Sequence, residues 1–232
     1  MTRPVAIGII DSGAHPRQFG RIHSARRFSA APSGDVESHD DVADRIGHGA
    51  ETVEIILKAG PNSRVMVAQV FDDALTTSAA RVAAALDWLI GEGARVINMS
   101  LGLSHDREVL RRACAHAHEA GAIVVASAPA RGGPVYPAAY DQVVAVTGDA
   151  RCALGEVSDL LGVQADFGTY GGEPSGQRVR AGASIASAQF TVLAAAYLAE
   201  HENADAEALK AHFRAQADYR GPERCGAVSD NG

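Results

Sequence analysis

The chain has 232 residues, of which 47% are hydrophobic and 5% aromatic, and its formal net charge is −7. This length allows one α/β domain with a sizeable core, and small aliphatic residues favour helices on a parallel sheet over an aromatic-rich β-sandwich. A negative net charge without a basic run argues against a nucleic-acid-binding surface. No apolar run approaches the roughly 18 residues of a transmembrane helix, so we expect no membrane partner.

Cysteine usage and the first residues predict a cytoplasmic protein. Cys114, Cys152 and Cys225 are widely spaced and form no Cys-x-x-Cys pair, which is typical of reduced thiols in a reducing compartment. The chain enters an apolar strand at Val5, without the features of a signal peptide.

The first predicted strand covers residues 5–10 and is apolar on both faces, as in a buried parallel strand. It leads into Asp11, at the edge where open α/β sheets place their ligands. Residues 14–46 are polar and contain Pro and Gly, so we expect an irregular excursion there. Its acidic stretch, residues 35–44, lacks the ligand spacing of a calcium loop and is more typical of a solvated face.

The rest of the chain alternates between helices and strands at the spacing of βαβ units. The predicted helices cover residues 47–58, 77–90, 106–120, 184–198 and 204–213. The predicted strands cover residues 64–71, 95–99, 122–126 and 142–147. We therefore expect one α/β domain over residues 1–232, with a doubly wound, mostly parallel sheet between two layers of helices and a polar tail from about residue 215.

Three positions can carry chemistry together. Ser184 stands on a small-residue turn at the start of an apolar helix, where its hydroxyl is accessible and its own N–H can donate to an oxyanion. His48 lies between Gly47 and Gly49 at another helix start, which leaves its ring accessible. Taken singly, these residues fit an N-cap serine, a surface histidine and, for Asp11, a turn aspartate. Together they supply the nucleophile, the base and the carboxylate that hydroxyl catalysis needs.

The other histidines do not form a metal-binding motif. No His-Glu-x-x-His occurs, and His116 and His118 are two residues apart on a predicted helix, so their side chains diverge. We therefore expect no metal and no cofactor.

The segments around the three positions resemble the signature blocks of the subtilisin-like serine peptidases. These blocks are the strand ending in Asp-Ser-Gly at 11–13, Gly-His-Gly at 47–49 and Gly-x-Ser-x-Ala-Ser at 182–187. Segments 69–72, 96–102 and 136–138 resemble further parts of the family pattern. The resemblance spans about residues 5–200 and implies the three-layer subtilisin-like fold.

The resemblance also implies a role for each residue in a serine endopeptidase. Ser184 attacks the peptide carbonyl, His48 acts as general base and then acid, and Asp11 orients His48. Activity is then expected to rise with pH as His48 loses its proton, near its unperturbed pKa of about 6.5. The backbone groups that bind a protein or peptide substrate as an extended strand are expected from Ser100, Leu101 and Gly102.

The chain departs from the family pattern at the oxyanion site. Ala130 stands where the family has an Asn, and losing such a donor typically lowers kcat by about 10²–10³. The remaining candidate donors are the Ser184 N–H, the Ser127 hydroxyl and a loop N–H within residues 131–133. There is also no room before Val5 for a folding prosegment, which favours an intracellular enzyme.

These departures favour removal of a leader peptide from one dedicated substrate, as in the small subtilisin-like peptidases that act in peptide maturation. One alternative is a catalytically inactive subtilisin-like protein that binds peptides, which the absence of an amide at Ala130 favours. Another is a small-molecule or phosphate-binding domain that uses Asp11 at the sheet rim. That second alternative lacks a Gly-rich phosphate loop with a partnered Lys.

Overall fold

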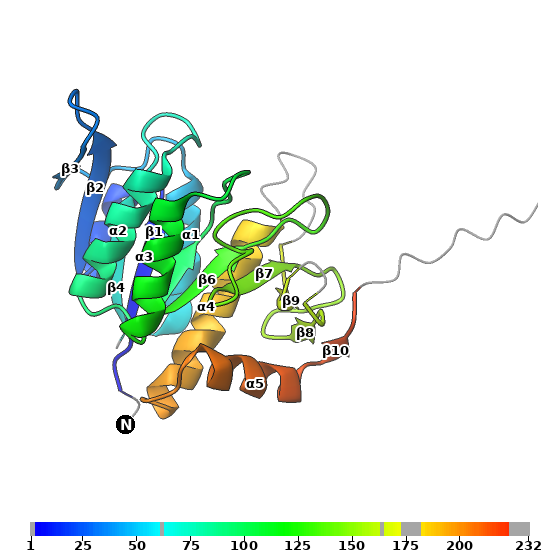
Figure 1. The fold of residues 1–232 in the computed structure, drawn as a ribbon. Helices are drawn as coiled ribbons and strands as arrows, with labels where there is room; N and C mark the ends of the chain where they lie inside the picture. Colours follow the sequence, from blue (N-terminus) through cyan, green and yellow to red (C-terminus); the bar gives the residue numbers. More distant parts are fainter. Residues whose placement is uncertain (1–2, 61–62, 163–164, 173–181, 223–232) are drawn as a thin grey trace, which may run out of the picture.

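The computed structural model describes residues 3–60, 63–162, 165–172 and 182–222 (Figure 1). Its strands are β1 (Ala6–Asp11), β2 (Ser24–Ala30), β3 (Val36–His39), β4 (Arg64–Gln69), β5 (Val96–Met99), β6 (Ile123–Ser127), β7 (Val144–Gly148), β8 (Val157–Asp159), β9 (Phe167–Thr169) and β10 (Tyr219–Arg220). Its α-helices are α1 (His48–Ile56), α2 (Ala79–Gly91), α3 (Glu108–Glu119), α4 (Ala183–Glu200) and α5 (Ala206–Gln216). Two short 3₁₀ helices are η1 (Pro16–Arg21) and η2 (Leu57–Ala59).

The strands form one sheet in the order β10-β8-β9-β7-β6-β5-β1-β4-β2-β3. Only the pairs β2–β3 and β8–β9 are antiparallel among the described strands. Helices α2 and α3 cover one face, and α1, α4 and α5 pack on the other (Figure 1). The predicted α/β class, a mostly parallel sheet between helices, is confirmed.

β1 lies where the strand order changes direction, because β4 pairs with it on one side and β5 on the other. In open α/β sheets, the crevice at the carboxyl ends of the strands at such a point is the usual place for a ligand. Asp11 is the last residue of β1 and is fully buried at this edge. The fold therefore positions Asp11 as the sequence analysis expected.

The expectation of an irregular segment over residues 14–46 is wrong. The segment contains η1, β2 and β3, and β2 extends the sheet by pairing in parallel with β4. Only Phe28 is buried within β2, so the strand lacks an apolar alternation that would identify it. Strand β3 pairs on one side only, at the end of the sheet, where polar residues are common.

Within the polar tail expected from about residue 215, the described residues include the end of α5 and strand β10. β10 pairs with β8, and the N–H groups of Asp218 and Gly221 donate to the carbonyls of Val157 (2.8 Å) and Asp159 (2.8 Å). Strands β8, β9 and β10 have three residues or fewer each, too short for a periodic pattern. Their pairing depends on tertiary contacts.

No helix among the described residues combines the length and apolar character that crossing a membrane requires. Cys114 and Cys152 are free and buried, and burial raises the pKa of both thiols. Cys225 lies outside the described residues.

We predict that Phe190→Ala destabilises the protein by about 3–5 kcal/mol. Phe190 is fully buried in α4, and its ring centroid lies 5.0 Å from that of Phe167 and 4.9 Å from that of Phe213. The matched variant Phe19→Ala changes a side chain that is 42% exposed, so its effect should stay within about 0.5 kcal/mol. Urea unfolding of both variants measures the difference, and equal losses would contradict the packing argument.

Candidate functional site

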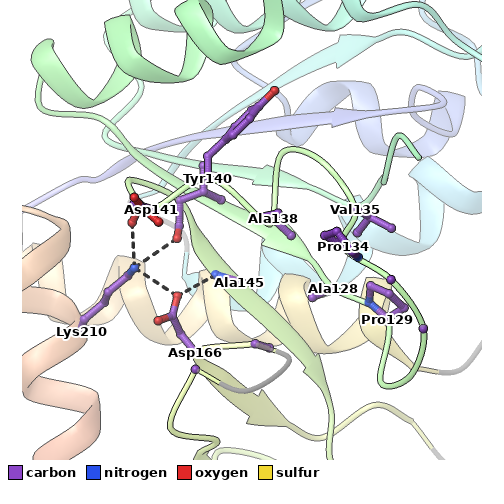
Figure 2. Close-up of a pocket in the computed structure, with 16 residues that line it drawn as sticks. Ala128, Pro129, Pro134, Val135, Ala138, Tyr140, Asp141, Ala145, Asp166 and Lys210 are labelled. Atoms are coloured by element: carbon purple, nitrogen blue, oxygen red, sulfur yellow. Dashed lines mark hydrogen bonds and ion pairs between the residues drawn. The ribbon is translucent and has the colours of Figure 1, made fainter. Parts of the chain in front are cut away.

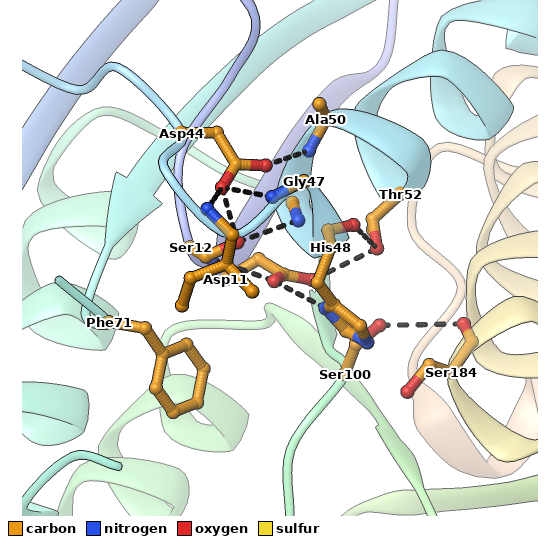
Figure 3. A network of polar contacts seen from close by, with 12 residues as sticks. Asp11, Ser12, Asp44, Gly47, His48, Ala50, Thr52, Phe71, Ser100 and Ser184 are labelled. Carbon is orange, nitrogen blue, oxygen red and sulfur yellow. Dashed lines mark hydrogen bonds and ion pairs between the residues drawn. The ribbon is translucent and has the colours of Figure 1, made fainter. Parts of the chain in front are cut away.

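The Asp11 carboxylate and the His48 imidazole form a hydrogen-bonded pair at the carboxyl end of β1. His48 Nδ1 lies 2.6 Å from Asp11 Oδ1 (Figure 3). The Ser12 N–H donates to the same oxygen (2.7 Å), and the Thr52 hydroxyl donates to Asp11 Oδ2 (2.9 Å). Because Asp11 is fully buried, these donors stabilise its charge and hold the carboxylate in one orientation.

Two glycines let α1 begin close enough to β1 for this contact. Gly47, the residue before the helix, has φ +88°, a left-handed conformation that favours glycine. A Cβ on Gly49 would lie 2.4 Å from the Gly13 carbonyl oxygen, so a side chain there would force α1 away from β1. The Gly-His-Gly sequence thus has a steric explanation that depends on the tertiary fold.

Asp44 caps the first turn of α1, because the N-cap residue Gly47 has no side chain that could accept a hydrogen bond. Its Oδ1 accepts from the N–H groups of Ile46 and Gly47 (2.8 Å each), and its Oδ2 accepts from the Ala50 N–H (2.7 Å). The expectation that the acidic stretch 35–44 forms a solvated face is wrong for Asp44, whose carboxylate accepts these hydrogen bonds. An aspartate shortly before a predicted helix start was the available signal, since such residues often cap helices.

The environment of His48 raises its pKa above the ordinary value. The hydrogen bond that His48 donates to Asp11 is the largest cause; burial acts in the opposite direction, and the charges of Asp11, Glu51 and Asp44 add to the rise. The expectation of an unperturbed His48 therefore differs from the structure. The Asp11 contact favours the protonated imidazole.

Ser184 lies in the first turn of α4, after Gly182 (φ +113°), and shares a cavity of about 430 Å³ with His48. Its carbonyl oxygen accepts hydrogen bonds from the hydroxyls of Ser187 (3.0 Å) and Ser100 (3.4 Å). In Figure 3 the His48 ring lies between Asp11 and Ser184. Within the described chain, no hydrogen bond joins the Ser184 hydroxyl to His48; such contacts often tighten only when a substrate binds.

The same cavity contains the segment expected to bind the substrate. Its lining includes Ser100, Leu101, Gly102, Leu103, Ser104 and Ser127, together with Phe71, Leu75, Thr76 and Thr77. Leu103 and Tyr136 exchange backbone hydrogen bonds (2.7 and 2.9 Å), which hold one end of this segment. Leu75, Thr76 and Thr77 were not among the expected site residues, because this stretch before α2 has no recognisable motif and Thr77 was assigned to the predicted helix.

The structure separates the two side-chain positions considered for the oxyanion site. Ser127 ends β6 and lines the cavity together with Ser184. Ala130 is exposed and is not one of the residues that line this cavity. A hydroxyl at position 127 is therefore better placed than position 130 to face a group bound at Ser184.

A second cavity, of about 440 Å³, is lined by the buried Lys210, whose ammonium group is fully hydrogen-bonded (Figure 2). Lys210 Nζ lies 3.2 Å from the carbonyl oxygens of Asp141 and Val143 and 3.1 Å from Asp166 Oδ2. An ammonium has three donors, and these three oxygens use all of them. Lys210 thus anchors α5 to the segment before β7.

The described residues contain no group of three or more His, Cys, Asp or Glu side chains suited to a metal ion. Pairwise contacts such as His116 Nδ1 with Asp87 (3.1 Å) are exposed side-chain hydrogen bonds.

Comparisons with known proteins show which family the chain resembles. The model of the subtilase family matches residues 2–228. The chain is similar to the thermostable alkaline protease of Halalkalibacterium halodurans, with 29% identity over 72% of this chain and 45% of that protein. It is also similar to the minor extracellular protease Epr of Bacillus subtilis, with 30% identity over 73% of this chain and 26% of that protein. The chain thus spans less than half the length of either relative.

Among solved structures, the fold is similar to the epidermin leader peptide processing serine protease (EpiP) of Staphylococcus aureus. The TM-score is 0.66 at 20% identity, and the alignment covers 90% of this chain and 67% of that one. At this identity the likeness concerns the fold.

We predict that the His48 imidazole titrates above its usual pKa of about 6.5 in the folded protein. Asp11→Asn should lower this pKa, because an amide cannot supply the charge that stabilises the imidazolium. Glu51→Gln should lower it less, because Glu51 acts only through its charge. NMR titration of the imidazole measures all three proteins, and a wild-type pKa at or below the usual value would contradict the analysis.

Proposed function

Because the chain belongs to the subtilase family, we propose that it is a serine endopeptidase in which Ser184 is the nucleophile, His48 the general base and Asp11 the residue that orients His48. The observation that carries the proposal is the 2.6 Å contact between His48 and the buried Asp11, next to the cavity that also contains Ser184. A paired imidazole beside a hydroxyl at a helix N-terminus is the arrangement that nucleophilic catalysis requires.

The proposed reaction proceeds in two halves. Ser184 Oγ attacks the peptide carbonyl carbon while His48 Nε2 accepts the hydroxyl proton, and Asp11 stabilises the imidazolium that forms. His48 then gives this proton to the leaving amine, and an acyl-enzyme remains on Ser184. In the second half, water attacks the acyl group with His48 again as the base, which releases the product and restores the Ser184 hydroxyl.

We further propose that the substrate is a protein or peptide bound as an extended strand along residues 100–102. The described residues that line this cavity include no Asp, Glu, Lys or Arg. Phe71, Leu75 and Leu101 supply apolar surface beside the site. This lining suits uncharged substrate residues next to the cleaved bond, because burying an unpaired charge there is costly.

Leader-peptide removal is the specific role that we propose. The sequence resembles the small subtilisin-like peptidase that removes the leader from the cross-linked small subunit of quinohemoprotein amine dehydrogenase. The fold is similar to that of EpiP, a leader peptide processing serine protease. A cytoplasmic location is part of this proposal, supported by the free, buried Cys114 and Cys152. Cell fractionation tests the location, and mass spectrometry of products from candidate precursors tests the role.

Ser184→Ala should abolish cleavage while leaving the free energy of unfolding nearly unchanged, because it removes one hydroxyl at a half-buried position. The wild-type protein should react with a fluorophosphonate probe at Ser184, and the variant should not. Reaction rates and mass spectrometry of the labelled peptide measure this. Folded wild-type protein that resists labelling would favour the alternative of a peptide-binding protein without catalysis.

Ser127→Ala should lower kcat by about 10²-fold if its hydroxyl donates to the developing oxyanion, because that charge exists only in the transition state. KM should change much less. Steady-state kinetics on a cleaved peptide separate the two constants. A variant with unchanged kcat would leave the backbone N–H groups of Ser184 and residues 131–133 as the remaining donors.

A further inference from the structure

The start of α1 is joined to the end of β1 by a second link beside the Asp11–His48 contact. Asp44 Oδ1 accepts a hydrogen bond from the Ser12 hydroxyl (3.0 Å), and Ser12 Oγ accepts from the Gly49 N–H (2.8 Å). Ser12 directly follows Asp11, and Gly49 directly follows His48. The residues that follow Asp11 and His48 in the chain are thus hydrogen-bonded to each other, which fixes the end of β1 against the start of α1 (Figure 3).

Asp44 is the centre of this second link. Its carboxylate accepts from one hydroxyl, on Ser12, and from three backbone N–H groups, on Ile46, Gly47 and Ala50. Its own N–H donates to the Ala14 carbonyl (3.0 Å), so its backbone is held by the segment after β1 as well. Gly47, the N-cap of α1, has no side chain to cap the helix. Asp44 therefore caps the first turn of α1, the turn that carries His48 at its first position.

We propose that Asp44 is a positioning residue for His48, which holds the imidazole against Asp11 by tying the first turn of α1 to the segment that follows β1. The inference rests on the proposed function for its catalytic consequence, although its structural part does not need catalysis. An ordinary helix cap would stabilise α1 alone. Asp44 also accepts a hydrogen bond from Ser12, the residue after Asp11, so this cap connects the helix that carries His48 to the strand that carries Asp11.

A carboxylate is required at position 44 because both of its oxygens accept. An asparagine keeps one acceptor oxygen and turns its amide hydrogens toward an N–H or hydroxyl that must donate. Asp44→Asn therefore loses at least one of the four hydrogen bonds and introduces a donor facing a donor. It also removes a negative charge near His48, where the described carboxylates acting on the ring are Asp11, Glu51 and Asp44.

The test measures Asp44→Asn with a matched control. We expect kcat to fall by about 10–100-fold with KM nearly unchanged, because a misplaced base slows the chemical step. The acid limb of the pH profile should move to lower pH, since removal of a nearby negative charge lowers the pKa of His48. Asp40→Asn removes the same charge from an exposed position on the same segment and should behave as the wild type.

A second readout does not depend on peptidase activity. In a Ser184→Ala background, NMR titration of His48 should show the same shift to lower pH in Asp44→Asn, and amide exchange at Gly47 and Ala50 should become faster. Ser12→Ala, which keeps the Asp44 charge, should lower kcat with a smaller shift of the titration. If the chain with Ser184 intact neither cleaves candidate substrates nor reacts with the fluorophosphonate probe, the proposed function fails, and the same His48 shift would still support the positioning role.

Three results would overturn the inference. The first is an Asp44→Asn protein with wild-type His48 titration and wild-type kcat, even if its unfolding temperature falls, because that is the behaviour of a simple helix cap. The second is an equal shift of the His48 pKa in Asp40→Asn, because the shift would then come from the change in net charge and not from the position of Asp44. The third applies if Asp44→Asn does not fold: the test then rests on Ser12→Ala, and wild-type kinetics in that variant would overturn the inference.

Discussion

The structure of this site depends on one hydrogen bond, between the fully buried Asp11 carboxylate and His48 Nδ1. A fully buried carboxylate is costly unless its charge is paired and its oxygens are bonded, and Ser12, Thr52 and His48 together meet that need. The contact requires the first turn of α1 to approach the end of β1 closely, and the absence of a side chain at Gly49 permits this approach. Backbone geometry and electrostatics thus place the imidazole before any substrate binds.

Ser184 is held by a separate set of polar contacts beneath α4. The Ser100 hydroxyl donates to the Ser184 carbonyl and accepts from the Asn98 amide (2.9 Å), and Asn98 accepts from Thr191 (3.2 Å) on α4. These buried groups join β5, the candidate substrate segment and the helix that carries the nucleophile. A polar network whose members satisfy one another favours a single arrangement of these elements. The two halves of the site therefore have independent supports and meet at the cavity between them.

The two cavities differ in whether their charged side chains are bound to partners. In the second cavity Lys210 is buried and Asp166 is half-buried. Each contacts several partners, which hold α5 and the segment before β7 together. At the candidate site, the described residues that line the cavity include no Asp, Glu, Lys or Arg. The Asp11 carboxylate lies behind the His48 ring and contacts it. An imidazole whose protonation can change is thus left as the one titratable group facing the cavity among its described lining residues. This arrangement is what proton transfer at neutral pH requires.

The sequence alone determined the α/β class, the long buried strands and helices, and three candidate residues in their order, because apolar periodicity and glycine-flanked polar residues are local signals. It could not determine β2 and β3, whose side chains are mostly polar, or β8 to β10, which are too short for a periodic pattern. The hydrogen bonds of Asp44 to the first turn of α1, and the position of Ser127 rather than Ala130 in the cavity lining, were also decided only by tertiary structure. Each depends on which segments, distant in sequence, lie against the residue, and a pattern along one chain does not contain that information.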